Sequence, residues 1–349
     1  MVDHDLLVPY GWTEAVSAHY TSMIEEDCVP ARVIRMDRGA CDIATPNGLA
    51  RGRCPRADAE VSGLCTGDWV SVDADYAVRQ LLPRRSAIMR SSASGRSQGQ
   101  VLAANVDTVL ICSAADTQVN LGRIERMLAL VWESAAQPIV LLTKADAAAY
   151  LPLDEVRAIA PGAAVLAVSA DTGAGLDVLH AMLDGTVALI GPSGAGKSTL
   201  ANALLGAEVF ATNTVRNADK KGRHTTVHRE LRPLPGGGTL IDTPGLRGVG
   251  LWTATTGIDK TFSDIESLAE QCHFRDCGHR GEPDCAVRDA IDNGELTQRR
   301  LDSYHKLERE NEWILARTDK RLQAERERYW RDITKRQRKL YRERGDTRR

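Results

Sequence analysis

Residues 186–200 read TVALIGPSGAGKSTL, and this stretch decides the fold. An apolar run ends at Ile190, a glycine-rich turn follows, and apolar residues return at helical spacing from Leu200 onward. The pattern predicts a strand, a turn and a helix, with the G-x-x-x-x-G-K-S arrangement of a phosphate-binding loop in the turn. Glycines let consecutive backbone N–H groups converge on phosphate oxygens, and the start of the helix adds the positive end of its dipole.

The loop predicts defined contacts with a nucleotide. We expect Lys197 to reach the β- and γ-phosphates and Ser198 to bind Mg²⁺. The other predicted phosphate-binding residues are Gly191, Pro192, Ser193, Gly194, Ala195, Gly196 and Thr199. The loop alone selects neither the nucleotide nor the reaction, because GPSGAGKST also suits guanylate kinases and ABC-type ATPases.

The composition is that of a globular protein with two or three domains. The chain has 349 residues, of which 43% are hydrophobic, and no stretch of 18 uncharged apolar residues, so we expect no membrane span. The N-terminal MVDHDLL lacks the basic region and apolar core of a signal peptide, which predicts a cytoplasmic protein.

Residues 299–349 hold 18 Lys and Arg against 10 Asp and Glu, so this tail carries +8 and the remainder −10 of the total −2. A basic tail on an acidic body predicts an anionic partner.

The N-terminal quarter has two different patterns. Residues 1–27 predict a loosely structured extension, in which Trp12 either anchors on the body or belongs to a mobile tail. Residues 28–85 hold about five short alternating segments between turn residues, which predicts a small β-barrel such as an OB-fold. Such barrels often bind nucleic acid, here through phosphates because aromatic residues are few. The arginines that would supply the charge are Arg32, Arg35, Arg38, Arg51, Arg53 and Arg56. Residues 86–104, rich in Ser and Gly, predict a linker or flexible loop.

From residue 105 the pattern changes to alternating strands and helices. Apolar runs at 106–114, 138–146 and 164–170 predict strands, and helical spacing recurs at 123–135, 153–160 and 176–183. This alternation predicts a parallel sheet covered by helices on both faces. Ligands of such sheets bind beyond the carboxyl ends of the strands.

Asp242-Thr243-Pro244-Gly245 follows another predicted strand, 45 residues after Lys197. Asp242 is where a Walker-B acid would hold Mg²⁺ through water, and Gly245 would offer its N–H to a γ-phosphate. The alternative for this motif alone is an ordinary turn, since Pro and Gly form turns.

Thr143-Lys144-Ala145-Asp146 closes a strand and predicts a guanine site. The Asp146 carboxylate can accept hydrogen bonds from N1–H and the exocyclic amine of guanine, two donors that adenine lacks. Lys144 would lie along the purine face, and Ser169-Ala170 at the next strand end could meet guanine O6 through a backbone N–H. Taken singly, either motif could be a set of strand-capping polar residues.

These motifs belong to GTPases, but their order is permuted. Ordinary GTPases begin with the phosphate loop, whereas here TKAD and SA precede it and DTPG follows it. In this order the chain resembles the RsgA (YjeQ) family of ribosome small subunit-dependent GTPases, over residues 28 to about 300. Further matching segments are 67–70, 104–107, 123–126, 222–226 and a cysteine cluster after residue 271.

The resemblance implies a multidomain fold. After the extension at 1–27, it implies an OB-fold β-barrel at 28–85, a circularly permuted α/β P-loop GTPase domain at 86–262 and a zinc-binding α-helical domain with a basic tail at 263–349. It further implies a monomer that binds the small (30S) ribosomal subunit and its rRNA and assists late maturation. The implied cofactors are GTP or GDP, Mg²⁺ and one structural Zn²⁺, with GTP turnover stimulated by the subunit.

Cys272, Cys277, His279 and Cys285 crowd into 14 residues. A disulfide framework is not expected in a long cytoplasmic chain, so the cluster predicts a metal site. Three thiolates and an imidazole suit tetrahedral Zn²⁺ and leave no open position, which predicts a structural role. We assign the nearby His273 to the surface, because the family pattern uses the later histidine.

Two positions depart from common GTPase patterns. Position 143 is Thr where Asn is usual, which predicts a lower nucleotide affinity. Leu246 stands where many GTPases place a water-orienting Gln, so another residue must position the attacking water. The resemblance implies His224 for this role, and it implies that Thr225 or Thr226 closes on Mg²⁺ and the γ-phosphate in the GTP state.

Two alternatives stay open. The first is a P-loop nucleotide kinase or ABC ATPase, against which stand TKAD, the metal cluster and the lack of an LSGGQ-like signature. The second is an RNA-binding assembly factor with a vestigial GTPase, for which Leu246 and Thr143 leave room. Residues 297–344 predict one or two charged helices whose excess of Arg and Lys favours contact with an RNA backbone.

Overall fold

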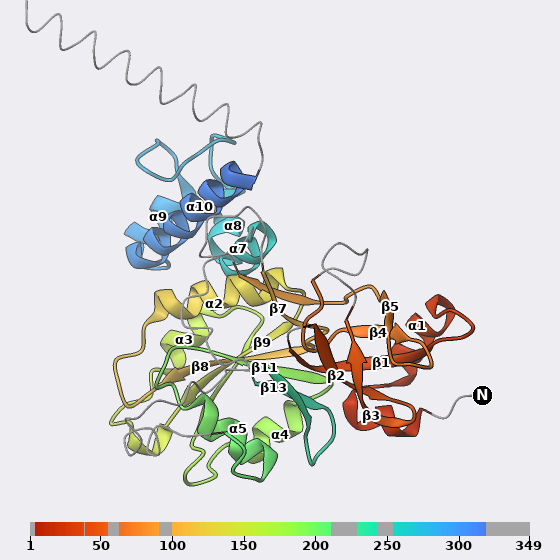
Figure 1. The fold of residues 1–349 in the computed structure, drawn as a ribbon. Coiled ribbons are helices and arrows are strands. Elements are labelled where there is room, and N and C mark those ends of the chain that lie inside the picture. Colours follow the sequence, from red (N-terminus) through yellow and green to blue (C-terminus); the bar gives the residue numbers. More distant parts are fainter. Residues whose placement is uncertain are drawn as a thin grey trace, which may run out of the picture.

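The computed structural model describes residues 4–37, 39–54, 63–90, 100–210, 229–242 and 254–318. Within these ranges, eleven strands join into one hydrogen-bonded sheet (Figure 1). One half of this sheet carries the phosphate loop, and the other half is formed by the N-terminal strands.

The nucleotide-binding half is a parallel sheet, as predicted. Its strands are β8 (Thr108–Ala114), β9 (Gln137–Thr143), β10 (Ala164–Val168), β11 (Thr186–Ile190), β12 (Glu230–Pro233) and β13 (Thr239–Asp242). The order is β10-β9-β8-β11-β13-β12, and all neighbours are parallel except β12 with β13. This pair is antiparallel because Leu234 and Gly238 close a tight turn in which Gly237 and Gly238 adopt φ of 99° and 77°.

Helices cover both faces of this sheet, which confirms the second part of the prediction. They are α2 (Leu121–Glu133), α3 (Leu153–Ile159), α4 (Leu176–Met182) and α5 (Lys197–Leu205). In β8, Val109 and Ile111 pack in the core with α2 and α3, whereas Leu110 and Cys112 pack in the core with α4 and α5. A strand buried on both faces reads as a continuous apolar run, which explains the sequence of β8.

The N-terminal strands pair in a closed cycle. They are β1 (Val29–Met36), β2 (Ala40–Thr45), β3 (Gly48–Arg53), β4 (Trp69–Val72) and β5 (Val78–Leu81). β1 pairs with β2 and β4, β2 with β3, and β4 with β5. A parallel bridge between Arg53 and Ala77 joins the end of β3 to the start of β5. The Arg35–Glu230 pair of β1 and β12 connects this cycle to the rest of the sheet.

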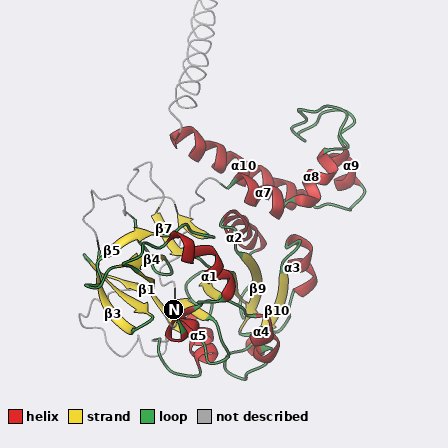
Figure 2. Cartoon of the chain, turned by 90° about the vertical axis from the view of Figure 1, so that its right-hand side faces the viewer, coloured by secondary structure: helices red, strands yellow, loops and turns green. Residues whose placement is uncertain are grey.

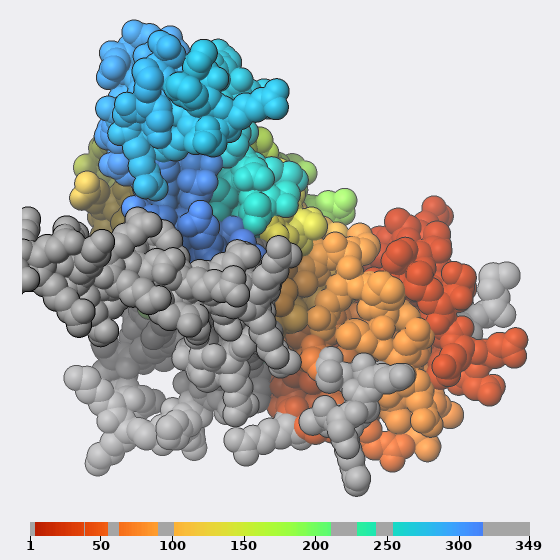
Figure 3. Space-filling model, turned by 90° about the horizontal axis from the view of Figure 1, so that it is seen from above, coloured from red at the N-terminus to blue at the C-terminus, as the bar shows by residue number. Residues whose placement is uncertain are grey.

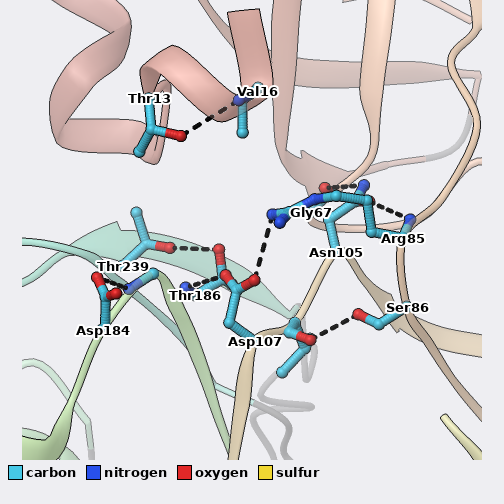
Figure 4. Close-up of polar contacts among 12 residues, drawn as sticks. Thr13, Val16, Gly67, Arg85, Ser86, Asn105, Asp107, Asp184, Thr186 and Thr239 are labelled. Carbon is cyan, nitrogen blue, oxygen red and sulfur yellow. Dashed lines mark hydrogen bonds and ion pairs between the residues drawn. The ribbon is translucent and has the colours of Figure 1, made fainter. Parts of the chain in front are cut away.

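The prediction of a loose N-terminal extension is wrong for the part that the structure describes. The segment forms the 3₁₀-helices η1 (Asp5–Tyr10) and η2 (Thr21–Met23) around α1 (Glu14–Tyr20). Leu7, Val16 and Tyr20 are buried, and Trp12 packs edge-on against Trp69 at 5.0 Å, so the anchoring alternative for Trp12 holds. The Thr13 hydroxyl accepts a hydrogen bond from the Val16 N–H and caps α1 (Figure 4).

The prediction of a linker at 86–104 is also wrong at both of its ends. β6 (Ala87–Arg90) and β7 (Gln100–Ala104) pair as a separate antiparallel sheet. Ile88 and Leu102 are fully buried, and their contribution is hidden in the sequence by the Ser- and Gly-rich composition between them. Residues 91–99 lie outside the described ranges.

Helices also form the C-terminal part: α7 (Thr255–Thr261), α8 (Ser263–Ala269), α9 (Ala286–Asp292) and α10 (Gln298–Thr318). α7 packs directly against α2 at Gly257. The two helices are so close that a Cβ at this position would overlap the Ala129 carbonyl oxygen. The Asn311 side chain of α10 accepts a hydrogen bond from the Ala254 N–H, which fixes the start of α7. Figures 1 and 2 show α2 below these helices, and Figure 3 shows them at a different end of the molecule from the N-terminal strands.

The predicted charged helix at 297–344 is present as α10 up to Thr318, and the rest of that range lies outside the described residues. Among the described helices, none combines the length and apolar character that a bilayer crossing requires.

The prediction that Arg32 supplies charge on the surface of the barrel is wrong. Its side chain is fully buried rather than available to nucleic acid, and its guanidinium lies 4.7 Å from the Trp69 ring. It donates hydrogen bonds to the Gly67 carbonyl at 3.0 Å and to Thr186 Oγ1 at 2.9 Å. Burial lowers the pKa of Arg32 to about 10, so the group remains charged at neutral pH. Arg32 therefore joins the N-terminal strands to the first residue of β11.

A second set of polar contacts holds the same end of β11 (Figure 4). The Thr186 N–H donates to Asp107 Oδ2 at 2.7 Å, and Asp107 pairs with Arg85 at 3.2 Å. Asn105 donates through Nδ2 to the Gly67 carbonyl at 3.0 Å. These contacts fix the strand that leads into the phosphate loop at the end opposite to that loop.

Candidate nucleotide site and metal centre

The phosphate loop has the predicted strand–turn–helix form. β11 ends at Ile190 and α5 begins at Lys197. Gly191, Gly194 and Gly196 adopt φ of 146°, 83° and 71°, values that L side chains rarely adopt. At Gly191 a Cβ would also lie 2.3 Å from the Cys112 carbonyl oxygen, so the close approach of β8 excludes any side chain there.

Lys197 lies against its own loop. Its ammonium donates hydrogen bonds to the carbonyl oxygens of Gly191 at 2.9 Å and Pro192 at 2.7 Å. These contacts hold the cation beside the first residues of the loop. Behind the loop, burial raises the pKa of the Cys112 thiol to about 12, so this side chain stays neutral.

Thr143 ties the end of β9 to the phosphate loop. Its Oγ1 lies 2.9 Å from the Ala195 carbonyl oxygen and 3.3 Å from the Ser113 carbonyl oxygen, and its proton can be donated to either. The side chain is 3% exposed, so water does not compete for this bond. Thr143 therefore connects the end of β9 to the phosphate loop, and the lower nucleotide affinity expected from the absence of Asn stays a prediction.

The predicted base-binding residues meet beside the phosphate loop. A cavity of about 80 Å³ is lined by Thr143, Lys144, Asp146, Val168, Ala170, Asp171, Gly196, Thr199 and Leu200. Lys144 has a left-handed φ of 56°, and its ammonium pairs with Asp116 at 2.7 Å. Asp146 follows in the 3₁₀-helix η3 (Ala145–Ala147). The cavity thus brings together a carboxylate, a lysine side chain and residues of the phosphate loop.

Ser169 takes a different position from Ala170. Its N–H donates to the Ala174 carbonyl at 2.9 Å, and its Oγ accepts from the Thr172 N–H at 3.1 Å. The Ser169 backbone donor is therefore used within its own turn, whereas Ala170 lines the cavity. Of the predicted pair, Ala170 lines the cavity and Ser169 does not, and the contact of Ala170 with a base stays a prediction.

Several predicted residues cannot be placed. His224, Thr225, Thr226, Gly245 and Leu246 lie outside the described residues. Asp242 is the last residue of β13, beside the strand that leads to the phosphate loop. Its backbone is at the predicted edge of the sheet, and its side chain is outside the described part.

The four predicted metal ligands come together. The donor atoms of Cys272, Cys277, His279 and Cys285 all lie within 4.8 Å of one another. The Cys272 and Cys285 sulfurs are 3.9 Å apart, and His279 Nδ1 lies 3.4 Å from Cys285 and 3.7 Å from Cys272. A tetrahedron with Zn–S bonds of about 2.3 Å has S–S edges of about 3.8 Å, so the donor set and its spacing fit Zn²⁺. His273 is exposed and outside the cluster, as predicted.

Sequence reasoning missed the side chains that support these sites. Asp116, the partner of Lys144, comes two residues after β8, so the rule that ligands bind beyond strand ends could have indicated it. Glu125 on α2 is fully buried and pairs with Arg299 and Arg300 of α10 at 3.0 and 2.8 Å. No local pattern indicates this cluster, because its members are 174 and 175 residues apart.

Comparison with known proteins agrees with this geometry. The RsgA GTPase family model matches residues 81–252. The small ribosomal subunit biogenesis GTPase RsgA of Streptomyces avermitilis is 54% identical over 339 residues, covering 93% of this chain and 90% of the relative. The protein of the same name from Streptomyces coelicolor is 51% identical over 337 residues, covering 93% and 91%.

Two solved structures share the fold. YjeQ from Thermotoga maritima superposes with a TM-score of 0.57 at 23% identity, covering 81% of this chain and 98% of that one. YloQ, described as a circularly permuted GTPase, gives a TM-score of 0.57 at 24% identity, covering 82% and 96%. The motif order, the shared fold and relatives more than half identical over most of their length show that this chain belongs to the RsgA family of circularly permuted GTPases.

Proposed function

We propose that the protein is a GTPase that binds the small (30S) ribosomal subunit and assists its late maturation, hydrolysing GTP to GDP and phosphate. The observation that carries the proposal is the cavity in which Asp146, Lys144 and Ala170 face Gly196 and Thr199 of the phosphate loop. It lies in a chain that is 54% identical to a relative named for small ribosomal subunit biogenesis. Subunit binding stimulates turnover, and the protein leaves the subunit after hydrolysis.

The nucleotide is held at three points. The Asp146 carboxylate accepts from the guanine N1–H and amine, the Lys144 stem covers the purine face, and the Ala170 N–H meets O6. The loop N–H groups and Lys197 hold the β- and γ-phosphates. Ser198 would bind Mg²⁺, and Asp242 would hold the ion through water. In the GTP state Thr225 or Thr226 would bind Mg²⁺, and Gly245 would donate its N–H to the γ-phosphate.

Hydrolysis requires an oriented water molecule. Leu246 cannot hydrogen-bond water, so His224 takes this role as a neutral imidazole. Mg²⁺, when bound, neutralises the charge that develops between the β- and γ-phosphates. Lys197 adds a second positive charge at the same place, and Thr143 keeps the base-binding turn aligned with the loop.

The N-terminal barrel and the C-terminal part would contact the small ribosomal subunit. The domain limits stay at residues 28–85, 86–262 and 263–349, and the closed cycle of β1 to β5 supports an OB-fold in the first. Arg35 and Arg51 pair with Asp37 and Asp42, which reduces the free charge of the barrel. We therefore assign most of the rRNA contact to the basic tail. One structural Zn²⁺ holds the C-terminal part, and the protein acts as a cytoplasmic monomer.

The test is GTP hydrolysis measured with and without purified small subunits. The proposal expects GTP and GDP to bind and ATP to be rejected, with turnover rising many-fold on subunit addition. ATP binding as tight as GTP binding would favour a nucleotide kinase or ATPase instead. Absence of stimulation would favour an RNA-binding assembly factor with a vestigial GTPase.

A further inference from the structure

A cleft of about 780 Å³ lies between the nucleotide-binding part and the first half of α10. Residue 115 and residues 117–122 form one wall. The connection from β8 to α2 is residues 115–120, and we refer to it as the β8–α2 loop. Tyr150, Pro152 and Glu155 form the second wall, and Arg299, Asp302, Ser303 and Lys306 of α10 form the third. The cleft is separate from the base-binding cavity, with which it shares no lining residue.

The α10 wall is held rigidly against the rest of the molecule. Buried Glu125 accepts hydrogen bonds from Arg299, Arg300 and Ser303, and Arg300 continues to Asp264 at 2.9 Å. Glu125 and Arg300 are both buried, and separating them would leave a charge unpaired in the interior, so this contact keeps its geometry. The cleft is therefore a built feature of the fold and not a loose gap between domains.

The groups that face this cleft suit an unpaired nucleotide. Tyr150 is 69% exposed and offers an aromatic face for stacking. The exposed Gln118 amide can donate and accept at a base edge. The ammonium of exposed Lys306 makes no ion pair with any described residue and is available to a phosphate. Proteins that read single-stranded RNA combine these elements: stacking, base-edge hydrogen bonds and a cation for the backbone.

The β8–α2 loop also borders the nucleotide site. Thr117, Gln118 and Asn120 line both the cleft and a second cavity of about 300 Å³, which extends to residues 192–195 of the phosphate loop. Asp116 in the same loop binds the Lys144 ammonium at 2.7 Å. One short segment thus has the cleft on one side and the nucleotide-binding residues on the other.

We propose that an unpaired nucleotide of the partner RNA enters this cleft and contacts the β8–α2 loop. This contact changes the position of the loop and, through the Asp116–Lys144 ion pair, the GTP site. The inference rests on the proposed function, because it takes the partner to be the small ribosomal subunit. An RNA that binds one arrangement of the loop better than another shifts the loop toward that arrangement. The cleft is in this way one route by which the subunit stimulates GTP turnover.

The first test compares GTP turnover over a range of small-subunit concentrations. Tyr150→Ala and Lys306→Ala leave basal turnover unchanged and raise the half-saturating subunit concentration, Tyr150→Ala by about fivefold or more because a base stack is lost. Tyr150→Phe keeps the stack and stays close to the wild type. Arg309→Ala is the matched control for Lys306, since Arg309 is an exposed cation one turn further along α10 and does not line the cleft.

The second test identifies the occupant. A photo-crosslinking amino acid replaces Gln118, and the protein is irradiated with small subunits. A crosslinked product that ribonuclease digests supports the inference, whereas a product with a ribosomal protein, or none, overturns it. Wild-type protein without any stimulation would defeat the proposed function itself. Wild-type stimulation with unchanged Tyr150→Ala and Lys306→Ala curves would defeat only the inference.

Discussion

Glu125 of α2 and Arg300 of α10 meet at 2.8 Å with both side chains buried, although 175 residues separate them in the chain. Arg300 also donates to Asp264 and to the Thr261 carbonyl, and its guanidinium lies 4.4 Å from the Phe262 ring. A single arginine therefore links α7, α8 and α10 to α2. This cluster, and not the chain connection alone, attaches the C-terminal helices to the nucleotide-binding part.

Glu125→Gln is expected to destabilise the protein by about 3 kcal/mol, because buried Arg300 loses the countercharge of a fully buried carboxylate. The free energy of unfolding from urea titration measures this effect. Arg157→Ala is the control, since its exposed pair with Asp154 contributes only about 0–1 kcal/mol. Equal unfolding midpoints for the two variants would show that the cluster does not hold the C-terminal helices.

Thr143→Val should weaken GDP binding about fivefold, since the hydroxyl that bonds the phosphate loop is lost and a single hydrogen bond contributes about 1 kcal/mol. The Kd of a fluorescent GDP analogue measures the change. Thr21→Val removes an exposed hydroxyl from η2, which lines neither cavity at the nucleotide site, and should leave the Kd unchanged. If both variants bind like the wild type, the Thr143 bond does not support the nucleotide site.

His224→Ala should lower subunit-stimulated turnover by about 100-fold or more, the usual range for a residue that assists proton transfer or water attack. GTP affinity should remain nearly intact, because the imidazole acts on water and not on the nucleotide. Turnover is measured with GTP and small subunits both saturating. A variant as fast as the wild type under these conditions would exclude the role.

Cys285→Ser should reduce bound zinc from one ion per chain to a small fraction, because a serine hydroxyl is a poor replacement for a thiolate. α9 begins at the next residue, so the variant should also lose helical signal in circular dichroism. Cys28→Ser, outside the cluster, is the control and should retain its zinc. Full zinc content in the Cys285 variant would remove this residue from the ligand set.

The parts of the molecule that could be predicted from sequence are those whose structure depends on residues close together in the chain. Gly191 to Ser198 fold as a strand, turn and helix because glycines, an apolar strand and the helix start are contiguous. The metal cluster is local for the same reason. The continuous apolar runs of β8 and β9 indicated a parallel sheet, because both faces of these strands are buried.

The parts that could not be predicted depend on partners far away in the chain. Leu7 and Tyr20 read as members of a loose extension, because the surface that buries them includes Trp69 on β4. Arg32 reads as a surface cation, whereas its acceptors are backbone carbonyls at positions 10, 67 and 105 and the hydroxyl of Thr186. Neutral carbonyls leave no signature in a sequence, so a buried arginine that they satisfy cannot be recognised there.

The contact of Gly257 with Ala129 has a mechanical consequence. With no room for even one methyl group between α7 and α2, and with Arg300 bridging the same helices, the C-terminal helices cannot swing without first separating from α2. α2 itself starts at the β8–α2 loop beside the phosphate loop. A displacement of α2 would therefore move α7, α8 and α10 with it, together with the metal-binding residues that begin after α8.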